Sequence, residues 1–296
     1  MEARHQPKQS SGHLMALVCV IVWGSTFVVS KSLMAHLRPA QLMLIRFILA
    51  YGALWVIHPK WQFHWRGEWR FLLMAIFANT LYAWAENTAL TLTQASNVSI
   101  LVTTSPIITA LALSALYREE RLSRKQTIGF GTAFAGVVLV VFNGAVSLRL
   151  QPMGDLLALL AAASWAAYGI LLRRWSGAYN SVLIIRKLMF YGILTVLPLV
   201  IAQGQPFVFS ALITWESAMK LAYLGFVGSA LCYWLWAGAV KQIGVLKANL
   251  YIYIVPLVTL VVSAVALQER ITVMGVTGMA LVIAGMVFAT VRGKAG

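Results

Sequence analysis

Glu86 is the residue of this sequence most able to do chemistry, because it is an acidic side chain deep within the apolar run 70–92. An ionised side chain at the centre of a bilayer costs about 2.5–3.5 kcal/mol on insertion scales, so such a residue faces a cavity, pairs with a cation or carries a proton. Asn79 and Tyr82 lie seven and four residues earlier, on the same face of a helix. Two interpretations stay open: Glu86 couples protons or binds an amine, or it forms a structural ion pair with Arg46.

Arg46 is the corresponding basic candidate, a few residues inside the apolar run 42–58. In a cavity, its guanidinium group could hold a substrate carboxylate through two parallel hydrogen bonds. The alternatives are that it reaches the lipid headgroups or pairs with Glu86, and a structural or gating role is favoured. Arg186 and Lys187, at the start of the run 181–202, are predicted to snorkel to the cytoplasmic interface.

Aromatic and polar residues on other apolar runs complete a predicted cavity. The rings could stack on an aromatic or cationic ligand, although most aromatic residues in membrane helices serve packing or the interface. Pro106 and Pro256 each fall in the middle of an apolar run and are predicted to kink their helices and act as hinges. The predicted cavity residues are Trp23, Ser25, Arg46, Asn79, Tyr82, Glu86, Thr103, Trp165, Tyr168, Tyr233, Asn249 and Tyr253.

The sequence gives no support for several other classes of function or site. Asp155 is the one aspartate, and no H-E-x-x-H motif or midplane cluster of carboxylates and histidines is present, so an intramembrane enzyme is a remote alternative with no catalytic residue to name. No G-x-x-x-x-G-K-[ST] motif is present, which argues against ATP as the direct energy source. Cys19 and Cys232 lie inside apolar runs, against a disulfide framework or a thiolate metal site. We predict neither a metal nor a cofactor.

Membrane helices must position these residues, because the composition excludes a soluble fold. Of 296 residues, 60% are hydrophobic and 10% are charged, and the mean hydropathy is +0.81, whereas soluble domains hold about 45–50% apolar and about 25% charged residues. A helix needs about 20 apolar residues to cross a bilayer. The apolar runs predict an all-α integral membrane protein with ten transmembrane helices at 14–35, 42–58, 70–92, 95–117, 126–143, 154–173, 181–202, 217–240, 246–267 and 272–291.

The net charge of +15 reflects membrane topology. Its basic residues occur singly or in short groups between apolar runs, and no groove-sized basic face for nucleic acid is indicated. With the N-terminus in the cytoplasm, fifteen Lys and Arg residues fall on the cytoplasmic side, five outside and three within spans. We therefore predict a multi-pass protein of the cell (inner) membrane with both termini cytoplasmic.

The segment 61–71 alternates aromatic and basic residues. Such a pattern is typical of an interfacial belt that contacts membrane lipids. A patch that binds lipid headgroups or serves regulation is the less favoured alternative.

The ten predicted helices divide into two similar halves. Trp23 corresponds to Trp165, Glu120-Arg121 to Glu269-Arg270, and the glycine pair Gly129/Gly136 to Gly278/Gly285. Because five is odd, the second half must enter the membrane inverted, a plan of secondary transporters that hold substrate between the halves and open to alternate sides. The predicted organisation is a cytoplasmic tail 1–13, a first repeat 14–143, an extracytoplasmic linker 144–153, a second repeat 154–291 and a cytoplasmic tail 292–296.

The paired glycines indicate close approach of helix backbones. The sequence leaves two arrangements open for these faces on the fifth and tenth helices. They pack against each other within one chain, or they form the contact of a homodimer.

A series of short motifs occurs in the first half and partly again in the second. They are Trp23-Gly24-Ser25, Leu44-Ile45-Arg46-Phe47, Pro106 with Glu120-Arg121, and Gly129 to Gly136, with Pro256, Glu269-Arg270-Ile271 and Gly278 to Gly285 in a second copy. Their order resembles the EamA family of the drug/metabolite transporter superfamily over about residues 14–291. The resemblance implies ten helices around a central cavity and export of small metabolites such as aromatic or other amino acids, by secondary active or facilitative transport. The alternative is proton-coupled efflux of multiple drugs or cationic compounds.

Overall fold

The structure, a computed structural model, is helical and built for a membrane. It describes residues 9–60, 62–63, 65–92, 98, 101–117, 122–142, 152–204, 214–267 and 272–290. All regular elements within these ranges are helices, which confirms the all-α class. Six of the described helical segments are long and apolar enough to cross a bilayer, namely Ser10–Leu33, Pro39–Ile57, Pro152–Ala178, Ser181–Ala202, Trp215–Ile243 and Val245–Val262. The Glu120-Arg121 and Glu269-Arg270 motifs and the linker 144–151 lie outside the described residues.

The first half begins with two long helices, followed by one that changes its winding partway along. A π-helix, η1, joins α3 to α4 without a break in the helical path, so residues 65–92 form one rod. The bounds are α1 Gln9–Leu33, α2 Pro39–Ile57, α3 Trp65–Ala75, η1 Ile76–Leu81, α4 Tyr82–Leu92, α6 Ser105–Leu116 and α7 Arg124–Phe142.

The second half repeats this order. Its third rod also contains a π-helix, η4, and its fourth contains a short 3-10 helix, η5. The bounds are α8 Pro152–Trp175, η3 Ser176–Ala178, α9 Ser181–Ala202, α11 Trp215–Ala222, η4 Tyr223–Leu231, α12 Cys232–Ile243, α13 Val245–Leu250, η5 Tyr251–Ile254, α14 Val255–Leu267 and α15 Val273–Thr290.

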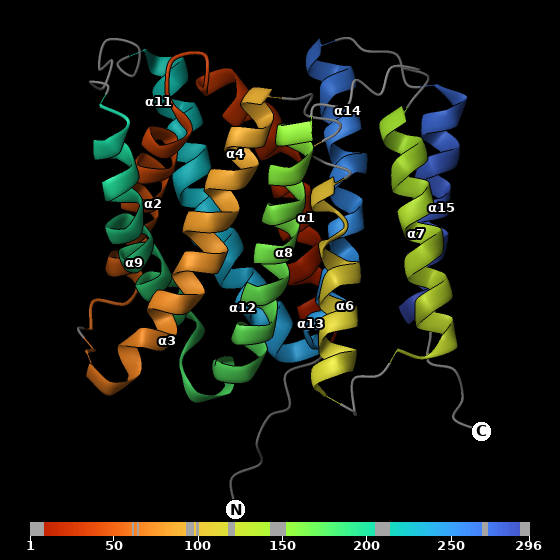
Figure 1. Cartoon of the computed structure of the whole chain (residues 1–296), viewed down its shortest axis with the longest axis horizontal. Helices are drawn as coiled ribbons and strands as arrows, with labels where there is room; N and C mark the ends of the chain where they lie inside the picture. The colour runs from red at the N-terminus through yellow and green to blue at the C-terminus, as the bar shows by residue number, and fades with distance from the viewer. Residues whose placement is uncertain are drawn as a thin grey trace, which may run out of the picture.

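The helices stand side by side, with α2 and α9 at one end of the row and α7 and α15 at the other (Figure 1). Helix α1 packs along α12 of the other half in the interior. The two are joined near the start of α1 by a hydrogen bond from Ser11 Oγ to Gln242 Oε1 of 2.6 Å. Further along, Trp23 Nε1 donates to the Gly228 carbonyl oxygen at 3.0 Å. The centre of the bundle is therefore built from elements of both halves.

Helices α7 and α15 approach so closely that only glycine fits at their contact. A Cβ atom added at Gly285 would lie 2.5 Å from the Ala133 backbone nitrogen, and one at Gly136 would lie 2.6 Å from the Val282 nitrogen. At Gly129 the nearest atom, the Ala289 Cβ, would be 2.6 Å away. The glycine faces are thus occupied within one chain in this structure, whereas a homodimer contact stays a prediction.

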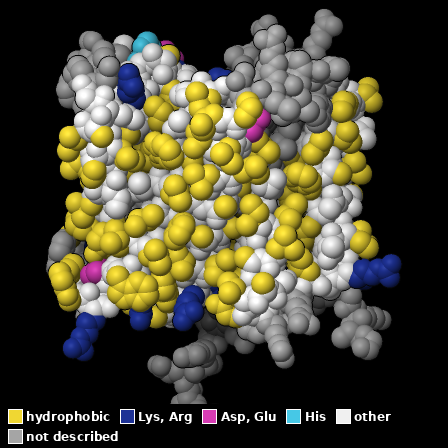
Figure 2. Space-filling view, viewed as in Figure 1, with side chains coloured by type: hydrophobic (Ala, Val, Ile, Leu, Met, Phe, Trp, Pro, Cys, Tyr) yellow, Lys and Arg dark blue, Asp and Glu magenta, His cyan; other side chains and the backbone are white. Residues whose placement is uncertain are grey.

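The lateral surface is largely hydrophobic, with Lys and Arg gathered near its two edges (Figure 2). Three aromatic residues around the start of α3 are exposed: Phe63, Trp65 and Trp69. They belong to the segment that we predict as an interfacial belt. Such a surface suits a protein surrounded by lipid.

Arg186 and Lys187 do not snorkel as predicted, because both side chains are buried, with 4% and 8% of their surface exposed. The Arg186 guanidinium group donates to the backbone oxygens of His58 and Lys60. Lys187 forms an ion pair with Glu68 of α3. The two cations hold the α2–α3 connection against α9, because a buried charge is stable only when it has partners.

Candidate functional site

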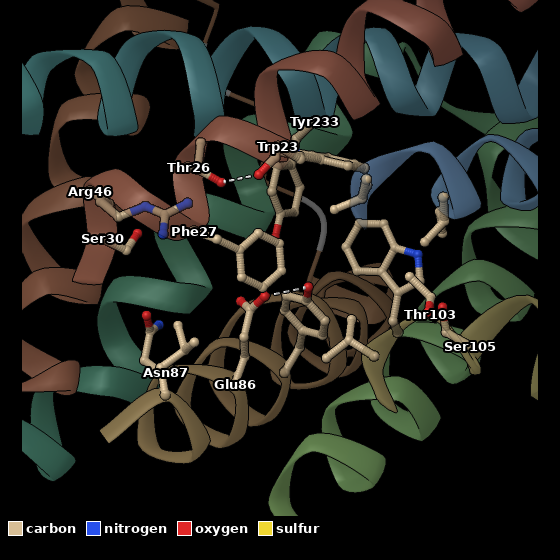
Figure 3. Close-up of a pocket in the computed structure, with 16 residues that line it drawn as sticks. Trp23, Thr26, Phe27, Ser30, Arg46, Glu86, Asn87, Thr103, Ser105 and Tyr233 are labelled. Atoms are coloured by element: carbon tan, nitrogen blue, oxygen red, sulfur yellow. Dashed lines mark hydrogen bonds between the residues drawn. The ribbon is translucent and has the colours of Figure 1, made fainter. Parts of the chain in front are cut away.

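Ligand sites in proteins usually place a few convergent polar groups on largely apolar walls. A cavity of this kind lies between helices of both halves (Figure 3). Its wall is formed by Trp23, Thr26, Phe27 and Ser30 of α1, Arg46 of α2, Tyr82, Glu86, Asn87 and Leu90 of α4, Val102 and Thr103 before α6, Ser105 of α6, Trp165 of α8, Tyr233 of α12, Ile252 of η5 and Val255 of α14.

The charged part of the wall holds Arg46 and Glu86, each with a separate partner. Arg46 Nε donates to Ser229 Oγ at 3.3 Å. Glu86 Oε1 accepts a hydrogen bond from the Tyr82 hydroxyl at 3.0 Å. Within the described residues no ion pair joins Arg46 to Glu86, so the predicted alternative of a structural pair is not formed in this conformation. The cavity therefore presents a guanidinium group and a carboxyl group that are not joined to each other.

Five aromatic side chains form much of the apolar wall, namely Trp23, Phe27, Tyr82, Trp165 and Tyr233. Trp165 lies edge-on to Trp23, with ring centroids 5.3 Å apart, and its centroid is 5.1 Å from that of Tyr82. The polar tips of Trp23 and Tyr233 are satisfied, since the Trp23 indole donates to Gly228 O and the Tyr233 hydroxyl donates to Ala78 O at 3.1 Å. These contacts fix the rings, which leaves aromatic surface for a ligand.

The two π-helices provide the carbonyl groups that anchor this wall. A π-turn breaks the regular i to i−4 hydrogen-bond ladder and is frequent at functional sites. In η1, the Ala78 oxygen accepts from Tyr233 and the Phe77 oxygen accepts from Ser164 at 2.8 Å. In η4, the Gly228 oxygen accepts from Trp23. Each half therefore anchors side chains of the other half through its own π-helix.

The geometry shows a candidate ligand site, and comparison with known proteins shows the family. The model of the EamA-like transporter family matches this chain twice, over residues 10–142 and 152–291. The chain belongs to the EamA-like transporter family. The resemblance found in the sequence motifs is thereby confirmed.

Relatives of this EamA-like transporter match it over most of its length. It is 28% identical to an uncharacterized transporter of Archaeoglobus fulgidus, over 96% of this chain and 98% of the relative. It is 27% identical to a probable amino-acid metabolite efflux pump of Salmonella typhimurium, over 92% of each chain. A solved crystal structure covers 95% of this chain with a TM-score of 0.76 at 19% identity, which indicates the same fold.

Seven of the twelve predicted cavity residues line the cavity of this EamA-like transporter, and five do not. Whether any of the twelve contacts substrate stays a prediction. The lining residues are Trp23, Arg46, Tyr82, Glu86, Thr103, Trp165 and Tyr233, and the others are Ser25, Asn79, Tyr168, Asn249 and Tyr253.

Three of the five have hydrogen bonds that direct them elsewhere. Asn79 Nδ2 donates to the Leu188 backbone oxygen of α9 at 2.8 Å, because η1 shifts the helical phase between Asn79 and Glu86. Ser25 Oγ is bonded to Val22 O and to the Tyr223 hydroxyl, and Asn249 Nδ2 donates to Thr109 Oγ1. The predicted polar stripe was wrong at Asn79 because it assumed an uninterrupted α-helix.

Pro106 and Pro256 lie at helix starts, in contrast to the predicted mid-helix kinks. Pro106 is in the first turn of α6, after the turn at Thr103 and Thr104, and Pro256 is the second residue of α14, after the 3-10 helix η5. Proline suits the first turn of a helix because its missing N–H has no intrahelical partner there. Both breaks border the cavity, whereas their movement as hinges stays a prediction.

Several lining residues were missed from the sequence although a signal for them exists. Thr26, Phe27 and Ser30 follow Trp23 by three, four and seven residues, so all four lie on one face of α1. The helical spacing that begins at Trp23 therefore predicts that these residues share one wall of the cavity. Among the described residues, no group of three or more His, Cys, Asp or Glu side chains is placed to hold a metal.

Proposed function

We propose that this protein is a secondary active or facilitative transporter that exports small zwitterionic metabolites, above all amino acids, by alternating access. The single observation that carries this proposal is the pair of unjoined opposite charges, Arg46 and Glu86, in one cavity with aromatic walls. The name of the Salmonella relative, a probable amino-acid metabolite efflux pump, supports the same class of substrate.

The proposed topology has ten membrane-crossing helices in two inverted repeats of five, with both termini in the cytoplasm. In support, the rod over residues 65–92 is about 42 Å long at 1.5 Å per residue, and the 19 residues of α7 give about 28 Å. The family model matches once in each half. The excess of Lys and Arg on one side favours that side as cytoplasmic.

The cavity chemistry suits both ends of an amino acid. A guanidinium group can bind a carboxylate with two parallel hydrogen bonds, and Arg46 keeps N–H groups beyond the Nε that bonds Ser229. Glu86 is placed to accept from an ammonium group, while Trp23, Trp165 and Tyr233 offer ring surface to an apolar or aromatic side chain.

Efflux of cationic compounds is the second candidate, favoured by Glu86 together with the aromatic rings. Arg46 argues against it, because a cationic ligand would meet a fixed positive charge in the same cavity. The two candidates predict opposite effects of Arg46→Gln, which should weaken amino-acid transport but strengthen transport of a cation.

The test is flux in proteoliposomes that contain the purified protein, measured with each radiolabelled L-amino acid and with ethidium as the cationic probe. We expect saturable amino-acid exchange that Arg46→Gln and Glu86→Gln each reduce at least about tenfold. Arg174→Gln and Glu216→Gln are the matched controls, since both side chains are exposed and lie away from the cavity. Ethidium flux without amino-acid flux from a folded protein would overturn the proposed substrate class.

Proton coupling through Glu86 is tested in the same vesicles by imposing a pH gradient. If Glu86 carries the coupled proton, the gradient accelerates wild-type flux, and any flux that remains in Glu86→Gln does not respond to it. A Glu86→Gln protein with unchanged pH-driven flux would eliminate this role.

A further inference from the structure

Two buried aromatic residues, Tyr168 and Trp236, form a second layer beneath the cavity. Each follows a lining residue by three positions, Tyr168 after Trp165 on α8 and Trp236 after Tyr233 on α12, and both are fully buried. The Tyr168 ring centroid is 5.2 Å from that of Trp165, and the Trp236 centroid is 5.1 Å from that of Trp23. The floor of the cavity is thus a continuous cluster of rings.

The two layers differ in how their polar atoms are satisfied. In the lining layer, the Trp23 indole and the Tyr233 hydroxyl each donate to a π-helix carbonyl. In the second layer, neither the Tyr168 hydroxyl nor the Trp236 indole N–H has a hydrogen-bond partner in the part of the chain that the structure describes. Such groups are rare in folded proteins, because burying an unpaired donor or acceptor is unfavourable.

These rings lie between the cavity and the edge at which α1 begins. On that edge the ends of the helices are joined, by Ser11 Oγ to Gln242 Oε1 and by a 2.9 Å contact between His13 Nδ1 and the Tyr251 hydroxyl. The cavity itself is displaced toward the other edge, since it includes Ser30 in the last turn of α1. In the proposed topology the joined edge is cytoplasmic, so the conformation is closed to the cytoplasm.

We infer that Tyr168 and Trp236 form the cytoplasmic gate of the translocation path and line that path when it opens. Their hydroxyl and indole N–H groups are unpaired in the closed conformation and are hydrated, or bonded to passing substrate, in the open one. Phenylalanine would fill the place of Tyr168 equally well in a permanently dry floor, so the unpaired Tyr168 hydroxyl points to water or substrate that reaches this layer in another conformation. This inference rests on the proposed alternating-access transport.

The energetic consequence has a definite sign. Removing the Tyr168 hydroxyl stabilises the closed conformation relative to the open one, because the open state loses a hydrated group and the closed state loses only an unpaired one. Removing the Tyr233 hydroxyl acts in the opposite direction, since its bond to Ala78 O is present in the closed conformation. The same chemical change at two neighbouring tyrosines thus gives opposite shifts.

The chain contains a native reporter for this gate. Cys19 is buried and lies four residues before Trp23, one helical turn toward the cytoplasmic end of α1, with its thiol donating to the Cys232 backbone oxygen at 3.1 Å. The sequence has two cysteines in all. A Cys232→Ser background therefore leaves Cys19 as the single thiol, and adding Cys19→Ser gives the unlabelled control.

The experiment measures modification of Cys19 by the charged, membrane-impermeant reagent MTSET in inside-out membrane vesicles. We expect Cys19 to be labelled from the cytoplasmic side, about tenfold more slowly in Tyr168→Phe and no more slowly in Tyr233→Phe. The thermal unfolding midpoint of Tyr168→Phe should equal or exceed that of the parent. A merely structural Tyr168 would leave the labelling rate unchanged.

Three results would overturn the inference: a parent whose Cys19 is never labelled, a Tyr168→Phe protein labelled as fast as the parent, or equal slowing in Tyr233→Phe. Amino-acid flux in proteoliposomes separates this outcome from the proposed function. Flux with an unresponsive Cys19 removes the gate and keeps the transporter. Gated labelling without amino-acid flux keeps the gate and removes the proposed substrate.

Discussion

Two carboxyl groups, the buried Glu68 and the half-buried Glu86, lie on the same rod of the molecule in opposite circumstances. Glu68 of α3 forms an ion pair with Lys187 and accepts a hydrogen bond from the Tyr191 hydroxyl at 2.7 Å. Glu86 of α4 has the Tyr82 hydroxyl as its partner and shares its cavity with Arg46, without an ion pair between them.

The difference separates charge that holds the fold from charge that is available to a ligand. A buried ion pair whose members have further hydrogen bonds is satisfied, and breaking it leaves one charge uncompensated. A cation and an anion held apart around a cavity can instead be neutralised by a zwitterion. Comparable residue types on one rod thus have separate roles, which substitutions can distinguish.

The largest expected effect comes from breaking the satisfied pair. Lys187→Met should lower the free energy of unfolding by about 3–5 kcal/mol, because Glu68 then stays buried without its cation. The measurement is denaturant-induced unfolding in detergent. The double variant Glu68→Gln/Lys187→Met should recover most of the loss, and a single variant as stable as the parent would contradict a structural role for the pair.

A smaller effect, on transport alone, is expected at the cavity cation. Arg46→Lys keeps the charge but loses the planar fork, so amino-acid flux should fall about tenfold. The unfolding midpoint should stay within about 1 °C of the parent, because no ion pair to Glu86 is lost. A large loss of stability with full flux would place Arg46 with Lys187 among the structural charges.

The smallest effects come from a matched pair of tyrosines, each of which donates its hydroxyl to one of the two carboxylates. Tyr191→Phe should lower the free energy of unfolding by about 1–2 kcal/mol and leave flux unchanged, because it removes a bond to Glu68. Tyr82→Phe should change flux about fivefold with little change in stability, because its bond to Glu86 lies in the cavity. Equal behaviour of the two variants in both assays would remove the distinction.

The same contrast explains what the sequence could predict. Glu86 and Arg46 are isolated charges within apolar runs. Such isolation can be read directly from the sequence, which therefore predicts both as cavity residues. The partnership of Glu68 with Lys187 joins residues 119 positions apart and depends on how α3 meets α9, so Lys187 was assigned to the interface. The family and the helical class follow from composition and motif order, both of which can be read from the sequence alone.

Helix phase was the main source of error at the site. Ile76–Leu81 gives no sequence sign of a π-helix, and the α-helical spacing that placed Asn79 beside Tyr82 and Glu86 fails across it. Tyr168 and Tyr253 were placed in the cavity by residue type alone, yet both are fully buried outside its wall. Residue type identifies candidate cavity residues. The direction in which each side chain points depends on the helices of the other half that pack against it.

The π-helix η1 also decides where this rod tolerates a change in length. A π-turn holds one residue more than an α-turn, so deleting one residue within Ile76–Leu81 would return the segment to ordinary winding and leave α4 in nearly its present phase relative to α3. Deleting one residue between Tyr82 and Glu86 would instead rotate Glu86 by about 100° around the helix axis, away from its place in the cavity wall. A lineage of such proteins can therefore lose a residue at η1 and keep this carboxylate in place, whereas a single-codon deletion in α4 before Glu86 would remove it from the cavity.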